Sequence, residues 1–147
     1  MRSFFAVTIA LSASMLASAA NPPKKLVIEK QYVPDLCPVS SKRGDKLAVK
    51  YIGTLFHNGV KFDTNENRAP FEFKLGARSV IDGWDEGLKD MCIGEKRKLI
   101  VPPDLAYGDK GIRYQIPPMA TLIFDVELVS LNGKDSYGSK EDSKKEL

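Results

Sequence analysis

The stretch of sequence that decides the fold is VIDGWDEGL, residues 80–88, which contains the only tryptophan of the chain. It begins a series of apolar residues at spacings of three and four, namely Ile81, Trp84, Leu88 and Met91. This spacing predicts a helix with one apolar face. Gly83 and Gly87 are poor helix formers, so packing must hold the segment or another group must approach it closely. Trp84 is therefore either the anchor of a core or the floor of a pocket.

Four other segments are short, partly alternating and rich in Val, Ile, Phe and Tyr: 47–52, 71–75, 96–101 and 121–131. They predict antiparallel strands. Asn58-Gly59 lies between the apolar runs 51–55 and 60–62 and is typical of a type I′ hairpin turn. The neighbouring His57 should then face solvent, which argues against a catalytic histidine. The pattern predicts an α+β fold in which one short helix packs on a sheet.

Composition and charge narrow the class of protein. The chain has 147 residues, 43% hydrophobic and 28% charged, which indicates one globular domain. Its net charge of +3 gives little reason to expect nucleic acid or an anionic membrane as partner. The basic run at residues 96–98 alternates over two strand faces without interleaved aromatic residues, so we expect a solvated surface there. No nucleic-acid partner is predicted.

Sequence motifs for cofactors and covalent catalysis are missing. There is no dinucleotide fingerprint, no Walker sequence and no serine in a nucleophile elbow. Two cysteines and one histidine fall short of a closed zinc site. We therefore predict no metal and no cofactor.

The first residues have the pattern of a secretory leader. Arg2 is followed by a mostly apolar run over residues 4–16, and Ala17-Ser18-Ala19 is a small-residue cleavage site. A short membrane anchor is the weaker alternative, because a spanning helix needs about 20 apolar residues. We expect a signal peptide at 1–19 and no membrane segment after its removal. In an exported chain the two cysteines, Cys37 and Cys92, predict one disulfide.

The polar segment 133–147 predicts a flexible tail after a folded domain at 20–132. Its last residues resemble the endoplasmic reticulum retrieval signal that ends in Lys-Asp-Glu-Leu, with a lysine in the place of the aspartate: Lys144, Lys145, Glu146 and Leu147. We expect a lumenal protein that binds a retrieval receptor through these residues. The alternative is a secreted protein with a solvated tail.

Six aromatic residues lie close to glycine, proline or a charged residue near the ends of the predicted elements: Tyr51, Phe62, Phe71, Trp84, Tyr107 and Phe124. Such residues usually form a core. They could instead line a concave apolar site that carries a few polar groups. The pattern alone leaves both interpretations open.

From about residue 44 to 131 the chain closely resembles the FKBP-type peptidyl-prolyl cis/trans isomerases, which bind rapamycin-like macrolides. The resemblance is carried by ordered motifs: Tyr51 with Gly53, Phe62 with Asp63, 70–73, Leu75 with Gly76, 80–84, 94–96, 106–108 and 116–125. The surroundings of the cysteines, residues 35–38 and 91–98, resemble the lumenal branch of the family.

The resemblance implies a strongly bent antiparallel β-sheet wrapped around one short α-helix, with a pocket between them. It implies a floor formed by Trp84, polar groups on Asp63 and Tyr107, and a hydrogen-bond donor in the Ile81 amide. The expected catalytic residues are Asp63, Tyr107, Trp84 and Phe62. The expected residues that bind substrate or macrolide are Tyr51, Phe71, Val80, Ile81, Ile116 and Phe124, with Ile116 closing one side of the rim.

The implied function is peptidyl-prolyl isomerisation of exported proteins by a monomer, through non-covalent binding that rapamycin-like macrolides inhibit. A proline-binding module or chaperone with little turnover is the alternative, and a secreted macrolide-responsive effector is a third. Two departures from the family pattern bear on ligand preference. The loop 62–70 is one residue shorter than the usual pattern, and residues 111–115 have bulkier side chains than the small residues or proline that family members often carry there. These bulkier side chains could narrow the rim of the pocket.

Overall fold

The computed structural model describes residues 20–135. The predicted leader, its cleavage site and the retrieval-like residues 144–147 therefore lie outside the described residues. Among those described, no helix is long and apolar enough to cross a membrane.

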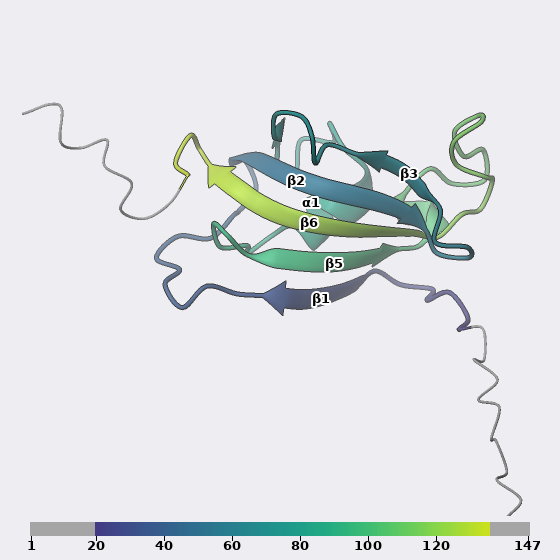
Figure 1. Cartoon of the computed structure of the whole chain (residues 1–147), viewed down its shortest axis with the longest axis horizontal. Coiled ribbons are helices and arrows are strands. Elements are labelled where there is room, and N and C mark those ends of the chain that lie inside the picture. Colours follow the sequence, from purple (N-terminus) through teal and green to yellow (C-terminus); the bar gives the residue numbers. More distant parts are fainter. Residues whose placement is uncertain (1–19, 136–147) are drawn as a thin grey trace, which may run out of the picture.

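Within residues 20–135, six strands form one antiparallel sheet (Figure 1): β1 (Val27–Tyr32), β2 (Lys46–Leu55), β3 (Lys61–Thr64), β4 (Phe71–Lys74), β5 (Lys96–Val101) and β6 (Leu122–Leu131). The strand order is β1-β5-β6-β2-β3, and β4 pairs with the other end of β2. The one α-helix of the described part of the chain, α1 (Asp82–Gly87), lies behind the sheet in that view, and a short 3₁₀ helix spans Pro103–Leu105. The predicted α+β architecture is confirmed.

The core lies between α1 and one face of the sheet. Residues that alternate along the central strands point to this face, and each is at most 4% exposed: Leu47, Val49, Leu99, Val101, Leu122, Phe124, Val126 and Leu128. The two helix glycines permit close contact with β5, since an added Cβ would lie 2.8 Å from Leu99 at Gly87 and closer still to Val101 at Gly83. Close approach therefore explains the glycines, as one of the two sequence interpretations expected.

The helix is shorter than its apolar pattern. It ends at Gly87, so Leu88 and Met91 follow it, although both are fully buried. The sequence pattern did not predict strand β1, because five of its six residues are exposed and its apolar alternation is weak. Elsewhere the predicted and observed strands agree to within three residues at their ends.

The predicted hairpin exists, but its predicted turn type is wrong. Leu55 N–H donates to the Val60 carbonyl at 2.9 Å, so four residues lie between the paired positions. Gly59 has φ +70°, whereas Asn58 is not among the described residues with positive φ. A type I′ turn requires positive φ at both positions, and four-residue loops are usually built around a type I turn. His57 is exposed there, as expected.

The predicted solvation of the basic run 96–98 is wrong for its middle residue. Lys96 is exposed and Lys98 is half-buried, but Arg97 is only 3% exposed. Strand alternation directs Arg97 to the same face as Leu99 and Val101, where backbone carbonyls and Glu95 accept its hydrogen bonds. The alternation in the sequence indicated that the run divides over the two faces of the strand. It did not indicate that hydrogen-bond acceptors for a guanidinium lie at the inner face.

The predicted disulfide between Cys37 and Cys92 is confirmed, with Cα atoms 5.4 Å apart. It joins the segment before β2 to the segment between α1 and β5. Because 55 positions separate the two cysteines, the bond closes a long loop of the chain.

Candidate functional site

A hollow of about 280 Å³ opens between α1 and the sheet. Ten residues line it: Tyr51, Phe62, Asp63, Phe71, Ser79, Val80, Ile81, Trp84, Tyr107 and Phe124. Nine of these are predicted site residues, and the fold brings them together from β2, β3, β4, β6, α1 and the loops around them. Ser79 is the lining residue that sequence reasoning missed. A larger hollow, about 550 Å³, is lined mainly by charged side chains on β5, β6 and their neighbours and lacks this aromatic lining.

Trp84 is the centre of the aromatic lining. It is 5% exposed, and its ring meets Tyr51 at 5.1 Å and Phe124 at 5.3 Å between centroids, both edge to face. Phe71 and Phe73 contact it at 6.2 and 5.6 Å. Edge-to-face packing is the favoured geometry of aromatic pairs. Trp84 is therefore both a core residue and part of the surface of the hollow.

The indole Nε1 of Trp84 is buried and has no nitrogen or oxygen acceptor within the described part of the chain. Such a donor costs about 1–3 kcal/mol unless another interaction compensates. The rings packed edge to face around Trp84 offer π-faces, which accept only weakly.

The backbone around Phe62 is shaped to admit its ring. Phe62 packs edge to face on Phe124 with centroids 5.7 Å apart. At Gly53 on β2, an added Cβ would lie 2.6 Å from the Phe62 ring and 3.1 Å from Phe124. Only glycine at this position leaves room for both rings, and this explains why Gly53 accompanies Tyr51 in the motif.

Asp63 provides the polar wall. One carboxylate oxygen accepts a hydrogen bond of 2.6 Å from the Tyr51 hydroxyl, and the other lies 3.7 Å from Arg68 Nη2. Arg68 also donates to the Thr64 carbonyl at 2.7 Å, which fixes its guanidinium beside this wall. Burial, followed by the hydrogen bond to Asp63, raises the pKa of Tyr51 above its ordinary value. Tyr51 therefore remains a neutral donor at physiological pH.

Tyr107 faces Asp63 from the opposite loop. Burial and the nearby Asp63 charge raise the pKa of its hydroxyl. The residue is 38% exposed, and its backbone carbonyl accepts from Gly111 N–H at 3.1 Å. The hydroxyl is therefore neutral, and Tyr107 is a partly exposed part of the lining of the hollow.

The helix entrance presents a backbone donor. Ile81 precedes α1 with φ −58° and ψ 149°, and its N–H makes no hydrogen bond within residues 20–135. The turn before it is held by Asp85, whose carboxylate accepts from Gly76 N–H at 2.8 Å and Arg78 N–H at 3.1 Å. Asp85 is 8% exposed. The same helix contains Asp82 and Glu86, both exposed, so residue type alone did not distinguish Asp85.

Ile116 is the predicted site residue that the structure does not bring into the lining. It is 4% exposed, and its N–H and carbonyl both pair with Ile112. Among the bulkier residues of the same loop, Tyr114 is 91% exposed and Arg113 stacks on its ring at 5.1 Å, whereas Ile112 packs against the core. None of these three side chains belongs to the lining of the hollow.

The described residues contain no cluster of His, Cys, Asp or Glu that could hold a metal ion. The site is an apolar cage with a carboxylate, two neutral tyrosine hydroxyls, the Ser79 side chain and one backbone donor. It suits a compact apolar ring next to a carbonyl group. It presents no histidine or cysteine nucleophile to a bound molecule.

Comparisons with known proteins agree with this geometry. Residues 37–129 match the family model described as FKBP-type peptidyl-prolyl cis-trans isomerase. FK506-binding protein 2 of Dictyostelium discoideum is 54% identical over 118 residues, which cover 80% of this chain and 88% of that protein. Human peptidyl-prolyl cis-trans isomerase FKBP2 is 44% identical over 126 residues, covering 85% of this chain and 88% of its own length. Peptidyl-prolyl cis-trans isomerase FKBP15-1 of Arabidopsis thaliana is 46% identical over 132 residues, which cover 89% of this chain and 84% of that protein.

A six-stranded antiparallel sheet around one short helix, together with these similarities, defines an isomerase domain. The chain belongs to the family of FKBP-type peptidyl-prolyl cis-trans isomerases.

Proposed function

We propose that this isomerase accelerates Xaa-Pro bond rotation in exported proteins by holding the proline ring in the aromatic hollow. The observation that carries the proposal is the cage around Trp84. It is lined by Asp63, by Tyr107 and by Ile81, whose N–H is unpaired within residues 20–135. The remaining walls of the cage are formed by Phe62, Tyr51, Phe71, Val80 and Phe124. Asp63, Tyr107, Trp84 and Phe62 are the proposed catalytic contacts.

Rotation about the peptide bond has a barrier of about 18–20 kcal/mol, because it breaks amide resonance while leaving every bond intact. The planar amide separates charge more than the twisted one. An apolar cage therefore favours the twisted state, which is differential binding of the transition state. The Ile81 N–H binds a substrate carbonyl and orients the chain. Without catalysis this rotation takes tens of seconds. Lowering the barrier by about 5 kcal/mol would make it several thousandfold faster.

Rapamycin-like macrolides are the proposed inhibitors, because a compact ring linked to a carbonyl matches the same cage and donor. The name of the Dictyostelium relative refers to binding of FK506, a property that we extend to this chain as part of the proposal. The test is isomerisation of a short proline peptide by the chain from residue 20, with increasing rapamycin. We expect catalysis that rapamycin abolishes at stoichiometric concentration. Catalysis that excess rapamycin leaves unchanged would reject the assignment of the hollow.

The second candidate is a module that holds proline segments with little turnover. It rests on the same apolar cage, which binds a proline ring whether or not the bond rotates. Binding of proline peptides without acceleration of their isomerisation would favour it. Asp63 and Tyr107, the polar groups beside the cage, favour turnover.

We propose the endoplasmic reticulum lumen as the compartment, with secretion as the alternative. The leader pattern at 1–19, the disulfide and the retrieval-like end at 144–147 support this location. The retrieval receptor would bind Lys144, Lys145, Glu146 and Leu147. Fractionation of cells that express the full chain tests the proposal, because recovery mainly from the medium would favour the secreted effector.

A further inference from the structure

Arg97 occupies an unusual place for a charged residue. It lies on the inner face of β5, 3% exposed, where its strand neighbours Leu99 and Val101 contribute to the core. Glu95, which pairs with its Nε, is 1% exposed. Buried charges are rare unless they are paired and hydrogen-bonded. The pair therefore has a role to which an apolar side chain at the same place is not suited.

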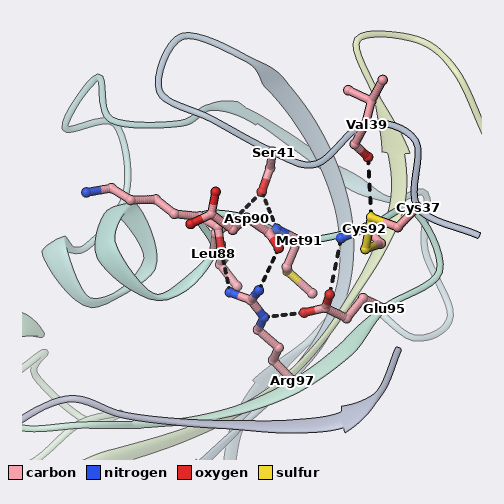
Figure 2. The surroundings of a disulfide bond; sticks show 10 residues. Cys37, Val39, Ser41, Leu88, Asp90, Met91, Cys92, Glu95 and Arg97 are labelled. Atoms are coloured by element: carbon pink, nitrogen blue, oxygen red, sulfur yellow. Dashed lines mark hydrogen bonds and ion pairs between the residues drawn. A yellow bond between two sulfur atoms is a disulfide. The ribbon is translucent and has the colours of Figure 1, made fainter. Parts of the chain in front are cut away.

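The guanidinium of Arg97 holds the end of α1. Nη1 donates to the Gly87 carbonyl at 3.0 Å and to the Lys89 carbonyl at 2.6 Å. Nη2 donates to the Asp90 carbonyl at 2.9 Å (Figure 2). The last carbonyls of a helix have no partner within the helix. Gly87 is the last residue of α1, and Lys89 and Asp90 follow it. A planar guanidinium donates to these three carbonyls and to Glu95 from three separate nitrogens, whereas a lysine donates from a single ammonium. Arg97 thus fixes the carboxyl end of the helix to β5.

The same group is connected to the disulfide. Glu95 accepts the Arg97 Nε–H with one oxygen and the Cys92 N–H, at 3.3 Å, with the other. Cys92 is bonded to Cys37, and the segment that follows Cys37 places Ser41 against the helix end. The Ser41 hydroxyl donates to the Leu88 carbonyl at 2.6 Å and accepts from Met91 N–H at 2.8 Å (Figure 2).

The other end of α1 forms the site. The helix has only six residues, with Ile81 immediately before it and Trp84 within its first turn. Trp84 accepts the Leu88 N–H at 3.0 Å through its carbonyl, which directly links the pocket floor to the segment that Ser41 and Arg97 hold. A movement at the carboxyl end is therefore transmitted to Trp84 and Ile81. Displacements of about 1 Å at a catalytic site cost as much as 100-fold in rate.

We infer that Arg97 is a positioning residue for the isomerase: with Glu95 it holds α1 at the depth and angle at which Trp84 and Ile81 meet the proline. The inference rests on the proposed function of the aromatic hollow. Arg97 acts from the far end of the helix and is not among the residues that line that hollow.

The test separates positioning from stability. The Glu95→Leu/Arg97→Met double variant replaces the buried pair by apolar residues, an exchange that proteins often tolerate. Arg97→Lys keeps the charge opposite Glu95 but removes the fork that binds three carbonyls. Leu131→Val, at the end of β6, is the control for a general loss of core packing. Each variant is assayed at a temperature at which circular dichroism shows it to be folded.

We expect kcat of both Arg97 variants to fall about tenfold while KM changes little, and the emission of Trp84, the only tryptophan, to shift. Leu131→Val should leave kcat and emission unchanged. Parental kcat and parental emission in a folded double variant would overturn the inference. Should the double variant fail to fold, the same two measurements on Arg97→Lys decide. Should the parent lack catalysis, the proposed function fails, and Trp84 emission still tests whether Arg97 sets the helix position.

Discussion

At the scale of single residues, the proposed site includes a backbone donor that only a substitution by proline removes. Ile81 has φ −58°, close to the φ that proline imposes, and its N–H is unpaired within residues 20–135. Ile81→Pro therefore deletes the donor while fitting the local backbone. We expect a folded protein with kcat/KM lowered about tenfold, the value of one hydrogen bond. The control is Ile81→Val, which retains the N–H. Unchanged peptide isomerisation by Ile81→Pro would exclude the amide from substrate binding.

Tyr51 makes stability depend on pH at the alkaline end. Its pKa is raised in the folded protein, so the folded state keeps the proton more tightly than the unfolded state. This contribution is complete below the unfolded value near 10 and is lost as pH rises through the folded pKa. Urea unfolding between pH 8 and 11 should show stability falling above about pH 10, and falling less in Tyr51→Phe. Equal slopes for the two proteins would contradict the assigned burial and the hydrogen bond to Asp63.

At the scale of elements, one lysine holds the loop that carries Arg68. Lys50 Nζ donates to the carbonyls of Arg68 at 2.6 Å, Glu66 at 3.2 Å and Asn65 at 3.5 Å. Lys50→Met should leave the thermal midpoint nearly unchanged but increase amide hydrogen exchange across 65–68 and weaken peptide binding severalfold. Lys46→Met removes only an exposed ion pair with Glu72 and serves as control. Parental exchange in Lys50→Met would show that this loop is held by other contacts.

The elements also show what could be predicted from sequence. Periodicity located α1 and the central strands, because buried apolar residues alternate or recur every three to four positions there. It missed β1, whose residues are mostly exposed, and it extended the helical pattern to Met91, which is buried without being helical. Nine site residues followed from a family resemblance. Ile116 pairs with Ile112 instead of lining the hollow, and Asp85 and Arg97 required knowledge of which backbone groups lie within reach.

At the scale of the whole molecule, the disulfide closes a loop over 55 positions. The chain-entropy model gives such a bond about 4 kcal/mol of stabilisation. Cys37→Ser/Cys92→Ser should therefore lower the free energy of unfolding by about that amount, with the reduced parent behaving in the same way. Urea titration followed by Trp84 emission measures both. A midpoint that is the same with and without the bond would show that the segment before β2 is held by Ser41 and its neighbours alone.

The central claim is that the aromatic hollow catalyses proline isomerisation. The most direct measurement is the rate of cis-to-trans conversion of a proline tetrapeptide by the parent, by Tyr107→Phe and by Tyr114→Phe. Tyr107 faces the hollow, whereas Tyr114 is 91% exposed on the same loop. We predict rapamycin-sensitive catalysis by the parent, a several-fold loss of kcat/KM in Tyr107→Phe and none in Tyr114→Phe. No catalysis by the folded parent, or equal rates for parent and Tyr107→Phe, would contradict this account of the site.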